Sequence, residues 1–124
     1  MKSEPLHKIF HIPMSEWLSS IPNELEDDAV GLWQIIPVGR SDFGLEGEAL
    51  IKYVREALLK LLLKGARPVE GAVDGVHYWR LRNDYGNDPE KIADAVIVEW
   101  ISSGRDPDPS GIWFALPKVF NLKH

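Results

Sequence analysis

The chain has 124 residues, of which 44% are hydrophobic and 27% charged, with a net charge of −5 and no cysteine. This length suits one domain, and the composition excludes a disordered chain, a disulfide framework, a zinc–thiolate site and a thiol nucleophile. The acidic balance argues against nucleic-acid binding, and no apolar run is long enough for a membrane span or a signal peptide, so we expect a cytoplasmic protein.

Residues 1–30 are predicted to form an N-terminal arm that contains one short helix. Ser15 suits the N-cap of a helical turn, and the acidic run over residues 24–28 is typical of a solvated linker. Three prolines interrupt any longer element: Pro5, Pro13 and Pro22. Residues 31–124 are then expected to form a single domain.

His7 and His11 lie four positions apart in this arm, which on a helix would place two imidazoles at the spacing of metal ligands. The flanking prolines disfavour a helix, and the sequence offers no third ligand. We therefore interpret the spacing as chance placement in a mobile arm.

Residues 31–38, Gly-Leu-Trp-Gln-Ile-Ile-Pro-Val, form a short apolar run. Periodicity cannot separate a strand from a buried helical turn over so few residues, but the bulky and β-branched side chains favour a strand. Residues 39–47 are predicted to be a loop.

Residues 46–64 show the strongest helical pattern, with apolar side chains over about half of the helical wheel and charged ones over the rest. Gly65 is a suitable stop. Leu59 and Leu63 lie one turn apart among the charged positions. Either the helix is sandwiched between layers of its own domain, which we favour, or this pair lies in an interface with a partner or a second copy.

Residues 67–82 are predicted to form a β-hairpin, because Asp74-Gly75 separates two runs with strand-forming residues. The second strand alternates, so that Arg80 lies on a mixed aromatic and basic face while His77 and Trp79 lie on the other.

A second long helix is predicted from Pro89 to about Ser103, with Asp88 as its N-cap and Gly104 as its left-handed stop. An aromatic strand follows over residues 112–116. The order of elements predicts a compact α+β domain, with two main helices packed on a small antiparallel sheet that includes the hairpin and this strand.

The turn between this helix and this strand begins like a calcium loop, with Asp106, Asp108, Ser110 and Gly111 at positions one, three, five and six. The twelfth position is Pro117 where a bidentate glutamate is needed. We therefore predict a rigid turn and no metal, and these residues stay only weak candidates.

Glu99 lies at the edge of the apolar face of the second helix, where a carboxylate must find a partner or shift its pKa. With His77 and one of three arginines it forms the one plausible acid–base set; the arginines are Arg67, Arg80 and Arg82. A structural ion pair is the commoner explanation, so the catalytic assignment of Glu99 and His77 is weak.

Two segments and one helix resemble a group of small bacterial proteins of unknown function. The residues that carry the likeness are Gly31-Leu32-Trp33, the leucine-rich helix ending at Gly65, Glu99-Trp100, Gly104-Arg105-Asp106-Pro107, Gly111 and Trp113-Phe114. The resemblance implies a bacterial cytosolic protein and supplies no catalytic residue.

The leading hypothesis is a non-enzymatic protein-interaction module, of an accessory or immunity-like kind, that binds another protein or forms a homodimer without a cofactor. It rests on an excess of tryptophan, five in 124 residues, and on the absence of phosphate-binding, hydrolase and dinucleotide motifs. The candidate binding residues are Leu59, Leu63, Trp79, Arg80 and Arg82. The alternatives are a winged-helix-like nucleic-acid binder, and a small-molecule binder or enzyme with a pocket near Glu99 and His77.

Overall fold

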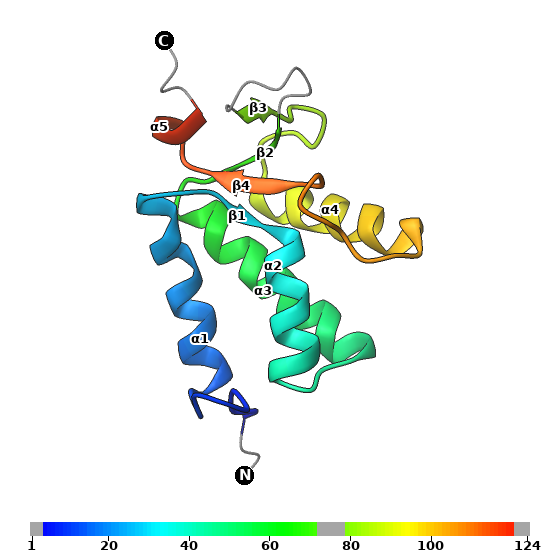
Figure 1. Ribbon diagram of the computed structural model, residues 1–124. Coiled ribbons are helices and arrows are strands. Elements are labelled where there is room, and N and C mark those ends of the chain that lie inside the picture. The colour runs from blue at the N-terminus through cyan, green and yellow to red at the C-terminus, as the bar shows by residue number, and fades with distance from the viewer. Residues whose placement is uncertain (1–3, 72–78, 121–124) are drawn as a thin grey trace.

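An antiparallel sheet lies at one end of the protein, and helices extend from it towards the other end, as the computed structural model in Figure 1 shows. The structure describes residues 4–71 and 79–120. Within these residues the sheet has four strands in the order β1-β4-β2-β3. They are β1 (Val30–Gly31), β2 (Arg67–Gly71), β3 (Trp79–Leu81) and β4 (Trp113–Ala115). The predicted α+β class, the pairing of the hairpin strands and the strand within 112–116 are confirmed.

Phe114 of β4 lies in the interior of the sheet, where it pairs with Val30 of β1 on one side and with Pro68 of β2 on the other. Its side chain is fully buried. The predicted Asp74-Gly75 turn lies outside the described residues.

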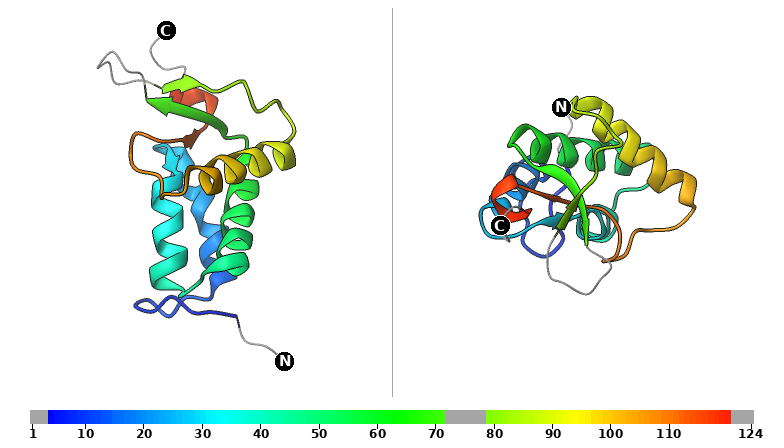
Figure 2. Two further views of the ribbon diagram at one scale, coloured as in Figure 1. Left: turned by 90° about the vertical axis from the view of Figure 1, so that its right-hand side faces the viewer. Right: turned by 90° about the horizontal axis from the view of Figure 1, so that it is seen from above.

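Two long helices pack against each other below the sheet (Figures 1 and 2). They are α3 (Gly47–Leu63) and α4 (Pro89–Ser103), and both were expected from their apolar stripes. The Asp88 side chain accepts a hydrogen bond from the Lys91 amide, and Gly104 adopts a φ of 72° at the other end. Aspartate capping and a left-handed glycine stop therefore define α4 as predicted.

The strand predicted over residues 31–38 is wrong beyond Gly31. The segment forms α2 (Leu32–Pro37) followed by a π-helical turn, η2 (Val38–Asp42), so part of the predicted loop is also helical. Leu32, Ile35 and Ile36 are all buried, a spacing that puts them on one helical face. Burial of this face against the core outweighs the strand preference of the β-branched side chains.

The expected short helix before residue 30 is present as α1 (Met14–Ser20), and a 3₁₀ helix, η1 (Ile21–Glu26), follows it. Leu18 and Leu25 are buried in the same core cluster as α2, α3 and α4. The segment from α1 to η1 is therefore packed into the domain, where an arm was expected. The last described element is the short helix α5 (Pro117–Phe120).

Candidate functional site

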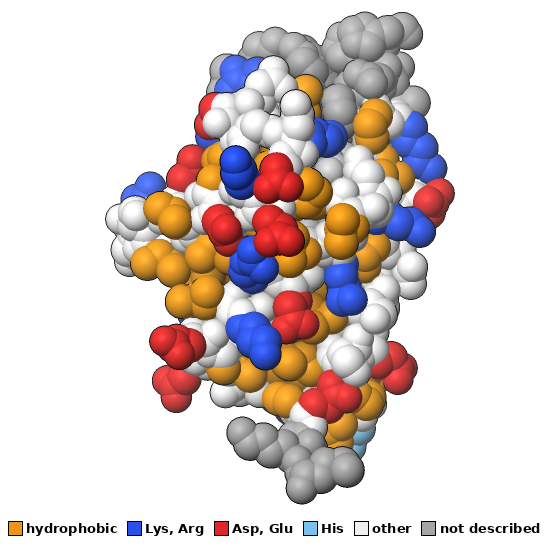
Figure 3. Space-filling view, turned by 180° about the vertical axis from the view of Figure 1, so that it is seen from behind, with side chains coloured by type: hydrophobic (Ala, Val, Ile, Leu, Met, Phe, Trp, Pro, Cys, Tyr) orange, Lys and Arg blue, Asp and Glu red, His pale blue; other side chains and the backbone are white. Residues whose placement is uncertain are grey.

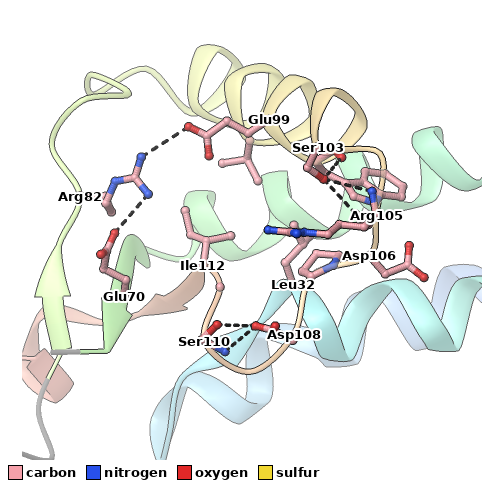
Figure 4. A pocket seen from close by; sticks show the side chains of 14 residues that line it. Leu32, Glu70, Arg82, Glu99, Ser103, Arg105, Asp106, Asp108, Ser110 and Ile112 are labelled. Atoms are coloured by element: carbon pink, nitrogen blue, oxygen red, sulfur yellow. Dashed lines mark hydrogen bonds and ion pairs between the residues drawn. The ribbon is translucent and has the colours of Figure 1, made fainter. Parts of the chain in front are cut away.

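A cleft of about 340 Å³ lies beside Glu99, between the C-terminal half of α4, the loop that follows it and the hairpin (Figure 4). Its floor is apolar and its rim is charged. The residues that matter for its chemistry are Glu70, Arg82, Glu99, Trp100, Arg105 and Ile112.

Arg82 is the centre of an ion-pair network along one wall of this cleft. Its guanidinium contacts Glu70 at 3.2 Å, Asp84 at 2.6 Å and Glu99 at 3.4 Å. It also lies 4.7 Å from the ring centre of Tyr85, and the Tyr85 hydroxyl donates a 2.6 Å hydrogen bond to Glu99. Glu99 therefore has the partners that a carboxylate at this place on α4 requires, one an arginine and the other a tyrosine.

The acid–base set expected from the sequence is only partly brought together. His77 lies outside the described residues, so its distance to Glu99 is not defined. Arg67 donates hydrogen bonds to the Gly86 carbonyl and the Asn87 side chain, and it is not among the residues that line this cleft. In the described part of the wall, the Glu99 carboxylate is held in place by Arg82 and Tyr85.

Burial is the main cause that raises the pKa of the Tyr85 hydroxyl, and its hydrogen bond to Glu99 adds to the effect. On the other side of the network, the hydrogen bonds from Arg82 lower the pKa of Asp84 from 3.8 to about 2. At neutral pH Tyr85 therefore keeps its proton and acts as a donor, while Asp84 acts as an acceptor.

The Asp84 shift predicts a pH dependence of stability. A carboxyl group whose pKa is lower in the folded state favours folding when it is ionised, so its contribution is present above about pH 4 and is lost as the pH falls through about 2. Chemical denaturation of wild type and Asp84→Asn should show their difference in unfolding free energy shrinking over this window. Parallel pH profiles for the two proteins would contradict the network.

The weak calcium candidates are engaged with protein groups. Asp106 pairs with Arg40, and Asp108 accepts hydrogen bonds from the backbone and hydroxyl of Ser110. Among the described residues, no group of three or more acidic or histidine side chains is arranged to hold a metal ion. The segment is a hydrogen-bonded turn, in which Arg105 extends across the cleft (Figure 4).

The predicted binding residues do not gather in one place. Leu59 is partly buried against the core, which is the sandwiched arrangement, whereas Leu63 is 75% exposed and borders a shallow groove. Arg80 pairs with Glu70. Trp79 belongs to β3, but its side chain is outside what the structure describes. A binding role for Leu63 stays a prediction.

An exposed apolar loop, which no sequence pattern had indicated, lies at the end of the molecule opposite the sheet (Figure 1). This loop spans residues 5–13 and is closed by a bridge between Leu6 and Pro13. Leu6, Ile9 and Phe10 are 53%, 63% and 62% exposed, so we name residues 5–13 the apolar loop. Large apolar side chains grouped on a surface are typical of interaction sites.

The buried side chain of His7 stabilises the conformation of the apolar loop through hydrogen bonds to the loop backbone. It is 3% exposed, and its Nδ1 accepts hydrogen bonds from the amides of Ile9 and Phe10, each at 3.2 Å. Because Nδ1 accepts, the proton of the neutral ring is on Nε2, which lies 3.3 Å from the Asp42 carboxylate in η2. The histidine interpreted as chance placement is therefore the residue that fixes the conformation of this loop.

Backbone and aromatic contacts complete the attachment of the loop. The Lys8 amide donates to the Asp42 carbonyl at 2.9 Å, and the Met14 amide donates to the Pro5 carbonyl at 2.9 Å. The His7 ring lies 4.9 Å from the Trp17 ring and 5.5 Å from the Phe43 ring. The loop is thus anchored to both α1 and η2.

The face formed by α3 and α4 has a different character, seen from behind in Figure 3, where acidic and basic side chains lie among apolar ones. Arg55 of α3 pairs there with Asp94 at 2.8 Å and with Glu90 at 3.5 Å, both on α4. Val98 and Ile101 are more than half exposed on α4. They lie three positions apart, so they are neighbours on one face of this helix.

Fold and contacts define the chain as a small α+β domain with a charged cleft and an exposed apolar loop. Comparisons with models of known families, with curated proteins and with solved structures give no match. The resemblance to small bacterial proteins stays a prediction. Among the described residues, no helix combines the length and the apolar character needed to cross a bilayer.

Proposed function

We propose that this protein is a non-enzymatic protein-interaction module that binds a protein partner through the apolar loop. The observation that carries the proposal is the combination of exposure and fixed backbone in this loop. Leu6, Ile9 and Phe10 each leave more than half of the side chain in contact with solvent, while the backbone around them is hydrogen bonded to His7 and Asp42.

A preformed loop lowers the entropic cost of association, since its conformation is not ordered at the moment of binding. Burying the exposed part of each of the three apolar side chains contributes roughly 1 kcal/mol. These terms favour a partner with an apolar groove that receives Ile9 and Phe10, with polar contacts at the rim.

The ion pairs of the charged cleft bear on whether this protein binds nucleic acid. Glu99 is held by Arg82 and Tyr85, and Arg82 is shared with two further carboxylates. An arginine engaged in this way is less available for phosphates, and α4 presents acidic side chains at Glu90 and Asp94. The nucleic-acid alternative therefore has less support than protein binding.

Photo-crosslinking in cells tests the proposal. A photoreactive phenylalanine analogue is placed at Phe10, or, as the matched control, at the exposed Lys52 on α3. Irradiation should give a discrete protein adduct from position 10 only, and Ile9→Ser should reduce it, because the apolar contact is weakened. Identical adducts from both positions, or none from position 10, would refute the apolar loop as the interaction surface.

The partner of the apolar loop could be a second copy of the same chain, and the molecular mass in solution tests this case. Light scattering over a range of concentrations should show a mass that rises above that of the 14.0 kDa monomer if a second copy is the partner. Ile9→Ser would then restore the monomer, whereas Leu63→Lys would do so only if the predicted contact at Leu63 is used.

A further inference from the structure

We infer that the apolar loop is released by mild acid: the loop is closed while His7 is neutral, and protonation of His7 opens it. The inference rests on the proposed function, because it adds a means of regulating the same binding surface. Histidine is the side chain that gains or loses a proton between pH 5 and 8. His7 is 3% exposed, and the loop backbone is hydrogen bonded to it. A change in the charge of its ring therefore acts directly on the loop.

The closed loop fits only the neutral form of the His7 ring. Nδ1 accepts hydrogen bonds from the amides of Ile9 and Phe10, so its lone pair is directed at two donors. In the imidazolium ion both ring nitrogens carry a hydrogen, and Nδ1 would then present a donor to these donors. Protonation in place would leave both amides without an acceptor, which is unfavourable for partly buried groups.

Neighbouring aromatic rings restrict the rotation of the His7 ring that would avoid this conflict. Its centroid lies 4.8 Å from that of Phe10, 4.9 Å from that of Trp17 and 5.5 Å from that of Phe43. A positive charge kept at this place would also lose its hydration, which disfavours the charged form. Opening of the loop removes both difficulties, because it exposes the ring to water and lets the two amides bond with solvent.

The Asp42 carboxylate opposes release, since it lies 3.3 Å from Nε2 and attracts a positive ring. This attraction is weakened, because the carboxylate is 23% exposed and the Lys8 ammonium lies 4.0 Å from its other oxygen. Tyr53 of α3 adds no charge, because burial raises the pKa of its hydroxyl and Asp42 adds to that effect. His11 is exposed, and its amide donates to the His7 carbonyl. Protonation therefore strengthens one partly screened ion pair and removes two hydrogen bonds.

The direction and the size of the effect follow from proton binding. The open loop binds one proton more than the closed loop, so opening increases as the pH falls, and the loop stays closed above about pH 7. An exposed histidine titrates at about pH 6.5, so the opening equilibrium should rise about 30-fold between pH 7.5 and pH 5. Amides that are protected about tenfold at pH 7.5 would then be almost unprotected at pH 5.

Hydrogen exchange of the Ile9 and Phe10 amides, measured by NMR on the free full chain at both pH values, tests the inference. Each rate is compared with that of an unstructured peptide at the same pH, which removes the intrinsic effect of acid on exchange. In wild type the opening should rise as stated, and the nitrogen chemical shifts of the His7 ring should report its protonation over the same pH range. His7→Asn keeps an acceptor for the two amides and does not titrate, so its opening should not change with pH. The matched control is His11→Asn, which should open as wild type does, because asparagine tolerates the positive φ of 60° at this position.

Three outcomes would overturn the inference. Equal opening of wild type at both pH values is one, and a protonated His7 ring with both amides still protected is another. The third is a rise in His7→Asn as large as that in wild type, which would assign the effect to another group. The first two outcomes need only wild type, so they decide the case even where asparagine fails to close the loop. Because no partner is present in these measurements, their failure is distinguishable from failure of the crosslinking that tests the proposed function.

Discussion

Replacing His7 with alanine is expected to lower the free energy of unfolding by about 3 kcal/mol. The substitution removes the acceptor for the Ile9 and Phe10 amides and deprives Asp42 of a partner. It also leaves a gap beside the rings of Trp17 and Phe43. Urea denaturation of the two proteins at pH 7 measures the difference.

His7→Asn is the matched control, because its side-chain oxygen can occupy the position of Nδ1 and keep an acceptor for the two amides. It should recover part of the lost stability, while the contact between His7 and Asp42 remains absent. If alanine and wild type agreed to within about 0.5 kcal/mol, His7 would not be a structural support of the apolar loop.

Replacing Phe114 with alanine should have the largest effect on stability, a loss of about 3–5 kcal/mol. Phe114 is fully buried in β4, one of the two inner strands, and its removal opens a void between the sheet and the helices. Because a domain of this size has a total stability of about 5–15 kcal/mol, this loss is a large share of the total, and the midpoint of thermal unfolding should fall well below that of wild type. Thermal unfolding followed by circular dichroism checks this result.

Phe114→Leu keeps an apolar side chain of smaller volume and should cost roughly 1 kcal/mol. A loss of similar size for alanine and leucine would show that backbone pairing, and not the ring, determines the stability of β4. A negligible loss for both would contradict the described core.

The elements predicted well from the sequence are those whose signals are local. The stripe of α3 extends over more than four turns, and α4 has both ends marked, by Asp88 and by Gly104. Their position on the sheet then followed from the need to bury these faces. The sequence also predicted that Glu99 forms an ion pair, which it does with Arg82. It did not predict the hydrogen bond from Tyr85 to Glu99.

The elements predicted poorly depend on contacts between distant parts of the chain. In α2, the burial of Leu32, Ile35 and Ile36 follows helical spacing, but one turn and a half is too short for that signal to outweigh β-branched composition. The role of His7 depends on Asp42, 35 positions later, and no local pattern could reveal it.

Hydrogen exchange of the Ile9 and Phe10 amides tests the central claim most directly, since the proposed function requires that the apolar loop is preformed in the free protein. Both amides donate to His7 Nδ1, so they should exchange at least tenfold more slowly than in an unstructured peptide and become unprotected in His7→Ala. Exchange of both amides at the unstructured rate in wild type would show that the loop is not held by His7, and would contradict the account.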